Sequence, residues 1–309
     1  MLQGAGTELD PFLITNLEEL RTELTDKTKY YKVTNNIDVI GTSYEYDWGT
    51  LYARFKQLDF NNKTLSNLKI SNGIFCFEKS NDSDSTKPIL INCNFENVVV
   101  TDKSLFVSLE DASTYATAKV FNLINCSISA KTATESTSSH SFFMYNRYQV
   151  KYNIDNLFLR IIVTNNIYQI FGNRAGSITN VQVDIVSTAT ISRIAHSGNL
   201  DLVIDNFIIS GNFKTNSRHM FENISMFTNV WCIAQIEGIG TSAQTFSFID
   251  AAQNKCFYIV DKITGYAGFM TVTNILRLTD EQARDYAYLN SQGFLLINDE
   301  EWFNWVIDI

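Results

Sequence analysis

Hydrophobic and polar residues alternate along much of this chain with a period of two positions. In the stretch from Ser177 to Ile185, Ile and Val stand between Thr, Asn, Gln and Asp. Alternation of this kind places successive side chains on opposite faces of an extended strand, whereas an amphipathic helix spaces its apolar residues three or four positions apart. The pattern therefore predicts a protein built from β-strands.

A short phrase centred on asparagine recurs in these strands. It reads as an apolar residue, any residue and then Asn, usually followed by another apolar residue. The intervals range from 21 residues (229 to 250, where Asp250 replaces Asn) to 33 residues (92 to 125). Spacing of this size is typical of a solenoid in which each repeat forms one coil. The repeat asparagines are Asn67, Asn92, Asn125, Asn156, Asn180, Asn206, Asn229 and Asn274.

Asparagine at one fixed place in each coil has a physical explanation. Its short side chain tolerates the left-handed backbone conformation that a tight bend requires, and stacked amides can hydrogen-bond to one another in a ladder. We therefore predict an all-β fold, a parallel β-helix of roughly nine coils. The alternative is an Asn-rich β-sandwich, which would need turns every 8 to 12 residues and usually more Gly and Pro than the 14 and 2 present here.

Both ends of the chain differ from the repeats. Residues 1–29 are predicted to form an N-terminal cap with a short helix, because Asn16 and Glu19 resemble a capping box. Residues 30–276 then form the parallel β-helix. Residues 277–309 form a C-terminal cap, with a capping box at Thr279 and Gln282 and a helix from 280 to 291 that ends at Gly293. Its aromatic cluster, which either closes the last coil or contacts another subunit, is Trp302, Phe303 and Trp305.

Two polar stretches within the repeats, residues 79–88 and 131–141, are predicted to be inserted loops. Neither resembles an interdomain linker, so we expect one continuous solenoid.

Composition and charge exclude several classes of partner. The net charge of −9 and the absence of a Lys/Arg cluster argue against nucleic acid, whose phosphates need a basic surface. No run approaches the 18 or so apolar residues that span a bilayer, so no membrane insertion is expected. The opening residues lack the basic and apolar regions of a secretory signal, so export by that route is not expected.

The five cysteines and three histidines give little sign of a metal site. The cysteines are odd in number and show no CxxC pair, which argues against both zinc and a disulfide framework. Cys93 and Cys126 each follow a repeat Asn, so we expect them to stack as small core residues. We predict neither a cofactor nor a bound metal.

The first 70 residues resemble a known family. A Gly-Thr pair at Gly6, then Asp-Pro-Phe-Leu-Ile at 10–14, a Leu-rich segment at 17–20, and a phrase ending Asn-Ile-Asp at 36–38 follow one another. This order is similar to the opening of GLUG-type right-handed parallel β-helix proteins, where the phrase usually ends in Asp-Ile-Asp. The stretch 58–68 is similar to the family's next coil but lacks its glycines, and 278–283 resembles the tail that often closes such proteins.

The resemblance implies a right-handed parallel β-helix on a surface or virion protein, because bacterial adhesins and phage tail, fibre and capsid-attached proteins share this opening. On this analogy we predict a non-enzymatic phage virion structural protein, a rigid scaffold for particle attachment or host-surface recognition. Its expected partners are other virion proteins, copies of itself in a trimer, and a cell-surface glycan. The alternatives are a glycan-cleaving tail-spike depolymerase and an adhesin on the bacterial cell surface.

Few residues suggest chemistry. Asp155 and Asp205 both precede a repeat Asn, two coils apart with Thr179 between them, which would suit a pair of hydrolytic carboxylates, although a solvated outer face explains them more simply. His219 stands near Arg218 and Glu222, where a salt bridge in a loop is the simpler interpretation. The candidate binding residues, which could instead be core aromatics, are Tyr145, Tyr148 and Tyr152.

Overall fold

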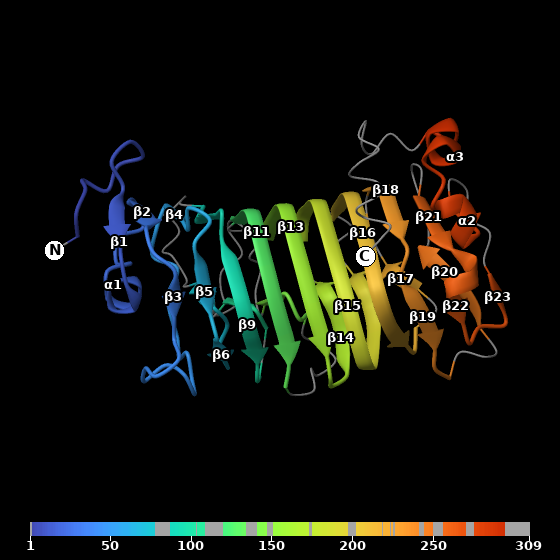
Figure 1. Cartoon of the computed structure of the whole chain (residues 1–309), viewed down its shortest axis with the longest axis horizontal. Coiled ribbons are helices and arrows are strands. Elements are labelled where there is room, and N and C mark those ends of the chain that lie inside the picture. The colour runs from blue at the N-terminus through green and yellow to red at the C-terminus, as the bar shows by residue number, and fades with distance from the viewer. Residues whose placement is uncertain are drawn as a thin grey trace, which may run out of the picture.

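The computed structural model describes residues 2–77, 87–102, 104–108, 120–133, 141–146, 151–172, 175–196, 202–217, 219–222, 224, 226–240, 244–249, 256–269 and 275–293. These residues form an elongated all-β solenoid with the N-terminal coil at one end and the C-terminal coils at the other (Figure 1). In Figure 1 the long front strands run downward while the chain advances from left to right, which is the right-handed sense of parallel crossover connections. The fold predicted from the alternation and the repeats is confirmed.

Every strand pair in the described part of the chain is parallel. Nine strands stack through one continuous column of paired residues, from Phe12 in the first strand to Phe227 in the ninth. These strands are β1 (Phe12–Ile14), β2 (Tyr30–Val33), β4 (Gln57–Asp59), β8 (Ile89–Ile91), β11 (Val120–Thr132), β13 (Lys151–Val163), β15 (Ala175–His196), β16 (Val203–Thr215) and β18 (Met226–Cys232).

Two more strands, β21 (Cys256–Ile259) and β24 (Ile275–Leu278), continue this stack beyond β18, and the remaining strands complete the other sides of the coils. One further side has β7 (Phe75–Phe77), β10 (Phe106–Ser108) and β12 (Met144–Asn146) in a small parallel sheet of their own. The others are β3 (Ile37–Asp38), β5 (Thr64–Ser66), β6 (Lys69–Ile70), β9 (Asn94–Val100), β14 (Ile167–Gly172), β17 (His219–Glu222), β19 (Gln235–Gly238), β20 (Thr245–Ile249), β22 (Ile263–Thr264) and β23 (Gly268–Phe269).

The core lies inside the coils and consists of the inward half of the alternation. Leu58, Leu90, Leu123, Ile154 and Ile178 occupy one column in consecutive coils, and each is at most 1% exposed. Burial of a Leu or Ile side chain contributes about 1.5 to 3 kcal/mol, and parallel stacking repeats this contribution in every coil. The alternating sequence therefore fixes which face of each strand turns inward.

The N-terminal helix α1 (Leu17–Thr22) begins as predicted. The side chain of Asn16 accepts a hydrogen bond from the backbone N–H of Glu19 at 3.0 Å. The Glu19 carboxylate turns to Thr15 instead of Asn16, accepting from its backbone N–H and its hydroxyl. Strand pairing starts before this helix, because β1 pairs with β2. The backbone N–H of Leu13 donates to the Gln3 carbonyl, so the opening segment lies against the outer edge of β1.

The C-terminal region has two short helices in place of the predicted helix 280–291. The Thr279–Gln282 capping box starts α2 (Asp280–Ala283), but the Asp285 side chain then accepts from Tyr288 N–H and caps a new helix, α3 (Tyr286–Ser291). A short 3-10 turn, η1 (Val260–Lys262), contacts α2. Gly293 follows α3 with φ 75°, as its predicted position after the helix requires.

These two helices cover the outside of the sheet. Ala283 and Leu289 pack with Phe257, Ile259 and Leu278 in an apolar cluster separate from the core inside the coils. The last coils contain an aromatic group of Phe246, Tyr258, Tyr266 and Phe269, with ring centroids 5.0 to 6.1 Å apart. Trp302, Phe303 and Trp305 lie outside the described residues. The domain boundaries at 29/30 and 276/277 stay predictions.

Of the two predicted loops, residues 79–86 and 134–140 lie outside the described part of the chain. The loop predicted for 131–141 was wrong at its start, because Lys131 and Thr132 belong to β11. None of the described helices has the length and apolar character needed to cross a bilayer.

Candidate functional site

Six repeat asparagines, from Asn92 to Asn229, lie at one corner of the solenoid in the left-handed backbone conformation. Asn92, Asn125, Asn156, Asn180 and Asn206 have φ between 52° and 57°. Only Gly, Asn and Asp adopt this conformation routinely, so the corner selects Asn in each of these coils.

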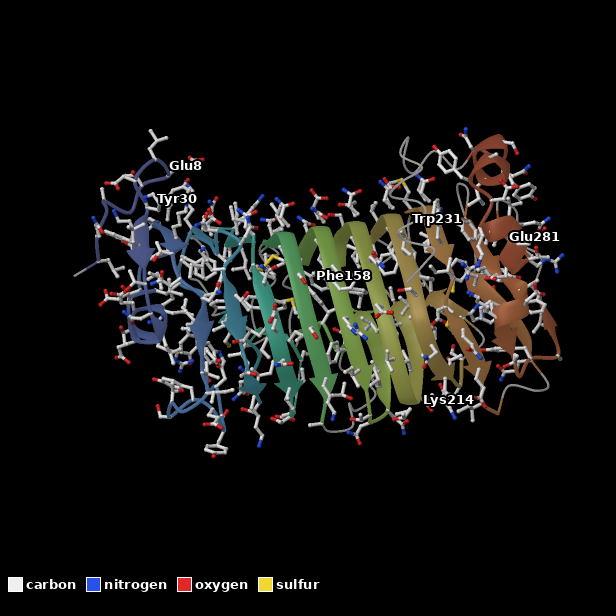
Figure 2. All side chains as sticks on the ribbon, in the orientation of Figure 1. Glu8, Tyr30, Phe158, Lys214, Trp231 and Glu281 are labelled. Carbon is white, nitrogen blue, oxygen red and sulfur yellow. A yellow bond between two sulfur atoms is a disulfide. The ribbon has the colours of Figure 1, made fainter. Side chains whose placement is uncertain are left out.

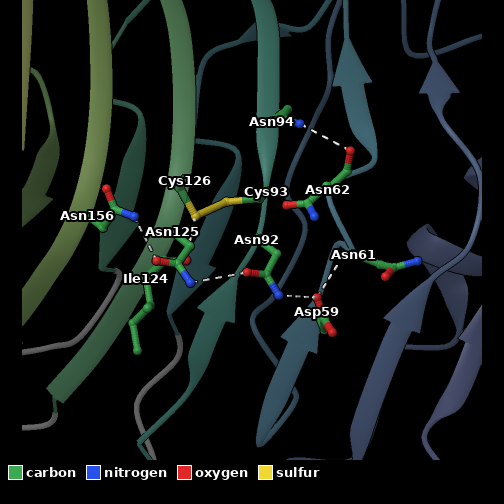
Figure 3. Close-up of a disulfide and its surroundings, with 10 residues drawn as sticks. All are labelled: Asp59, Asn61, Asn62, Asn92, Cys93, Asn94, Ile124, Asn125, Cys126 and Asn156. Atoms are coloured by element: carbon green, nitrogen blue, oxygen red, sulfur yellow. Dashed lines mark hydrogen bonds between the residues drawn. A yellow bond between two sulfur atoms is a disulfide. The ribbon is translucent and has the colours of Figure 1, made fainter. Parts of the chain in front are cut away.

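The amides at this corner form the predicted ladder (Figure 3). The Nδ2 of Asn125 donates to Oδ1 of Asn92 at 3.3 Å, and the Nδ2 of Asn156 donates to Oδ1 of Asn125 at 2.9 Å. Further along, Asn206 donates to Asn180 at 2.9 Å and Asn229 donates to Asn206 at 3.3 Å. Each amide thus donates toward the N-terminal end of the chain, and Asn92, Asn125, Asn180 and Asn206 also accept from the coil that follows.

A carboxylate stands at the start of each run of the ladder. Asn92 donates to Oδ1 of Asp59 at 2.9 Å, and Asn180 donates to Oδ1 of Asp155 at 2.7 Å. The aligned amide donors all point toward this end, so a negative charge there is favoured for the same reason that it is favoured at a helix N-terminus. The repeat pattern did not predict these carboxylate positions.

Asn67 belongs to a different corner from the other repeat asparagines. It donates to Asp38 at 2.9 Å and accepts from Asn97 at 3.0 Å, so these three residues form a second, shorter ladder. Its prediction as one member of a single series was therefore wrong, because the apolar-any-Asn phrase occurs at both corners of that coil. Asn274 lies outside the described residues.

Cys93 and Cys126 form a disulfide, which corrects the prediction that they stack as reduced core residues (Figure 3). Each follows a ladder Asn, and the two residues share one column in adjacent coils, with a Cα–Cα distance of 4.7 Å. Parallel strands stack about 4.8 Å apart, which lies within the range that a disulfide can bridge. The odd number of cysteines in the chain does not exclude a disulfide, whereas the shared repeat position of Cys93 and Cys126 indicates one.

Asp155 and Asp205 occupy one column with Thr179 between them, as predicted. Both carboxylates also serve the ladder. Asp155 accepts from Asn180 and from the Thr179 hydroxyl, and Asp205 lies 3.5 Å from the Nδ2 of Asn229. Two strand spacings separate them by roughly 9 to 10 Å.

The candidate tyrosines do not form one exposed group among the described residues. Tyr152 is fully buried, and its hydroxyl donates to the carbonyl and accepts from the N–H of Gly172, so it is a core residue that burial keeps protonated by raising its pKa. Tyr145 lies in β12, and its side chain is outside the described residues, as is all of Tyr148.

Glu222 forms an ion pair with a residue of the preceding coil, since it lies 2.7 Å from Nε of Arg193. Arg218 lies outside the described residues, so a salt bridge from it stays a prediction, and His219 and Glu222 belong to strand β17, not to a loop. Nη1 of the Arg193 guanidinium donates to the hydroxyl of Tyr168. The Nε2 of His196 is 4.0 Å from the Glu222 carboxylate. Burial, and then the charge of Arg193, lower the pKa of His196, so at neutral pH this imidazole is uncharged.

The outer face of the long sheet holds one aromatic and three polar side chains side by side, which we name the β13–β15 patch: Phe158, Arg160, Gln182 and Asp184. Phe158 pairs with Gln182, and Arg160 with Asp184, in neighbouring outward columns. Figure 2 shows Phe158 on this face, midway along the solenoid. Arg160 Nε lies 3.6 Å from Asp184 Oδ2, and Asp184 Oδ1 accepts from the Ser210 hydroxyl at 3.2 Å.

One polar atom in this patch has no hydrogen-bond partner. Gln182 is 8% exposed, and its Nε2 is buried without an acceptor. No group of three or more His, Cys, Asp or Glu residues that could hold a metal occurs in the described part of the chain.

Comparisons with known proteins support the fold. No protein-family model matches this chain, and no curated protein matches it. A crystal structure described as "a putative immunoglobulin A1 protease from Bacteroides ovatus" matches with a TM-score of 0.50 over 90% of this chain and 87% of that one, at 14% sequence identity. Similarity at this level shows a shared parallel β-helix-like architecture.

This match contradicts the prediction that the protein is not an enzyme, which we withdraw. That prediction relied on the fold and on the resemblance, and the matching structure with the same architecture is described as a protease. At 14% identity no activity and no residue role is carried over to this chain.

Proposed function

We propose that this protein is a rigid surface-binding scaffold: a parallel β-helix that displays its outer face for attachment to a particle or to a cell surface. The observation that carries the proposal is the uninterrupted stacking of nine strands, reinforced at one corner by side-chain amides that bond from coil to coil. A solenoid bonded in this way is stiff along its axis and presents its side chains in fixed columns.

The phage setting is part of the proposal. The resemblance of residues 6–38 to the opening of GLUG-type proteins supports a virion component such as a tail, fibre or capsid-attached protein, with other virion proteins as partners. The same resemblance supports side-by-side assembly into a trimer. Light scattering of the purified 35.1 kDa chain would then give roughly three times the mass of one chain, and a monomer over the whole concentration range would contradict trimer formation.

The bacterial cell surface is the alternative setting, and the Cys93–Cys126 disulfide favours it. Disulfides form and persist outside the reducing cytosol, in exported proteins above all. Antibody labelling of intact cells and of purified phage particles from the same culture distinguishes the settings. Label on particles supports the virion, and label on cells supports the adhesin. Protein confined to the cytosol, with both thiols free to alkylation, would contradict the scaffold proposal in either setting.

Cleavage of a bound glycan is a second candidate, favoured by the position of Asp155 and Asp205 in one column. Their separation of roughly 9 to 10 Å is close to that of carboxylates in inverting glycosidases. Incubation with capsular and cell-wall polysaccharides should then release new reducing ends. The activity should disappear in Asp205→Asn, which keeps an oxygen acceptor for the ladder. No release by the native chain would refute cleavage and leave the binding proposal intact.

A further inference from the structure

We infer that the β13–β15 patch is a binding site for a neutral sugar ring of a polysaccharide. The inference rests on the proposed surface-binding function and names its ligand class. Its starting point is the contrast within one outward column, where Asn94 and Ser127 on earlier coils precede the aromatic Phe158, and Gln182 follows on the next coil. An aromatic ring on the outside of a solenoid contributes nothing to the core inside the coils.

The four side chains of the patch supply the chemistry that a sugar ring requires. The apolar face of Phe158 can stack against the C–H face of a pyranose. Gln182, Arg160 and Asp184 carry amide, guanidinium and carboxylate groups, which are the planar donors and acceptors that pair with hydroxyls. Parallel stacking sets neighbouring members of a column about 4.8 Å apart, and members two residues apart along a strand lie about 6.6 Å apart. The patch therefore has the dimensions of one or two sugar rings.

The unpartnered amide is the observation that points to a ligand. More than nine-tenths of Gln182 is buried, and its Nε2 has no acceptor. A buried donor without an acceptor is costly to the fold, and such groups are unusual in folded proteins. A hydroxyl oxygen of a ring stacked on Phe158, directly beside Gln182, would accept this bond. The donor without a partner is thus explained by binding.

The charges favour a neutral sugar over an acidic one. Asp184 lies 3.6 Å from the Arg160 guanidinium, so the patch has a compensated pair and no net charge. The chain as a whole carries −9, which repels a polyanion. Binding should therefore change little between about 0.05 and 0.5 M salt, since no net charge is screened.

The experiment measures binding of the full chain to an array of neutral and acidic bacterial polysaccharides and host glycans, followed by titration of the polysaccharides that bind. Phe158→Ala should weaken binding to a neutral polysaccharide about tenfold, by loss of the stacked ring. Gln182→Leu removes the amide at similar volume, and it should weaken binding while leaving the thermal midpoint unchanged or higher, because it also removes the buried donor. The matched control is Met226→Ala, which truncates another outward apolar side chain on the same sheet, 40% exposed, and should bind like the native protein.

Each outcome decides the question. Native binding with loss in both patch variants supports the site. If the native chain binds a glycan and both variants bind equally well, the surface-binding proposal stands and this assignment is overturned. Binding that is restricted to acidic polysaccharides, or to proteins or to other copies of this chain, also overturns it. If no glycan binds while labelling still places the protein on particles or cells, the scaffold stands without a sugar site.

Discussion

Removal of the Cys93–Cys126 disulfide should lower the free energy of unfolding by about 3 to 4 kcal/mol. The two residues are 33 positions apart, and the chain-entropy relation for a closed loop of that size gives about 3.7 kcal/mol at 25 °C. For 309 residues, an unfolding entropy of about 2 cal/mol/K per residue converts this loss into a fall in the melting midpoint of about 6 °C.

The assay compares native protein and the double variant Cys93→Ala/Cys126→Ala in thermal and urea unfolding, each with and without a phosphine reductant. Reductant should destabilise the native protein to the level of the double variant and leave the variant itself unchanged. The matched control is Cys232→Ala, since Cys232 is buried but forms no disulfide. Its stability loss should be the same with and without reductant. A native protein whose midpoint does not respond to reductant would refute the reasoning.

Three further predictions concern the corner, the polar cluster around Glu222 and a close backbone contact. Asn156→Ala should lower the free energy of unfolding by about 2 to 3 kcal/mol, because alanine is strained in the left-handed conformation and the side-chain hydrogen bond is lost. Asn156→Gly loses only the hydrogen bond and should lower it by about 1 kcal/mol. Equal losses for the two variants in urea unfolding would contradict the role of the positive φ. The pKa of His196 is lowered in the folded state, so the unfolded chain binds the proton first as the pH falls. The free energy of unfolding should therefore be at its full value above about pH 6.5 and decline below it. His196→Gln should flatten this dependence of stability on pH between about pH 7 and 5.5, compared with the native protein. Gly211→Ala places a Cβ 2.0 Å from the Ile185 carbonyl oxygen and should cost about 2 kcal/mol more than Gly240→Ala, which has positive φ but meets nothing within 4 Å; similar melting midpoints would contradict this.

The fold could be predicted from the sequence because it depends on patterns that repeat over short distances along the chain. Alternation sets which side chains of β11, β13 and β15 face inward, and Asn in the left-handed conformation marks each corner. The position of Asp155 and Asp205 in one column followed directly from counting repeats. Where two corners carry the same phrase, as at Asn67 and Asn92, the pattern alone could not tell them apart. Their hydrogen-bond partners in neighbouring coils do.

The candidate sites were harder to predict because they depend on contacts between coils. The pairing of Arg193 with Glu222 joins residues 29 positions apart, and neither stands in a motif. Tyrosine is common in ligand-binding sites, but the place of Tyr152 in the alternation of inward and outward positions turns its side chain into the core. The disulfide could have been found, because equivalent positions in adjacent repeats are neighbours in any parallel solenoid. Counting cysteines across the whole chain concealed that relation.

The one-way direction of the amide ladder has a consequence for how proteins of this kind can change in size. Asn125, Asn156, Asn180 and Asn206 each donate to an acceptor in the coil before, which is Asp155 for Asn180 and an Asn for the other three. A whole turn could therefore be duplicated or deleted between Asn125 and Asn206, and every amide donor would again meet an acceptor. Half a turn could not be added or removed, since it would shift the ladder Asn out of the column that holds its acceptor in the coil before. We therefore expect solenoids of this kind to change in length during evolution by whole coils.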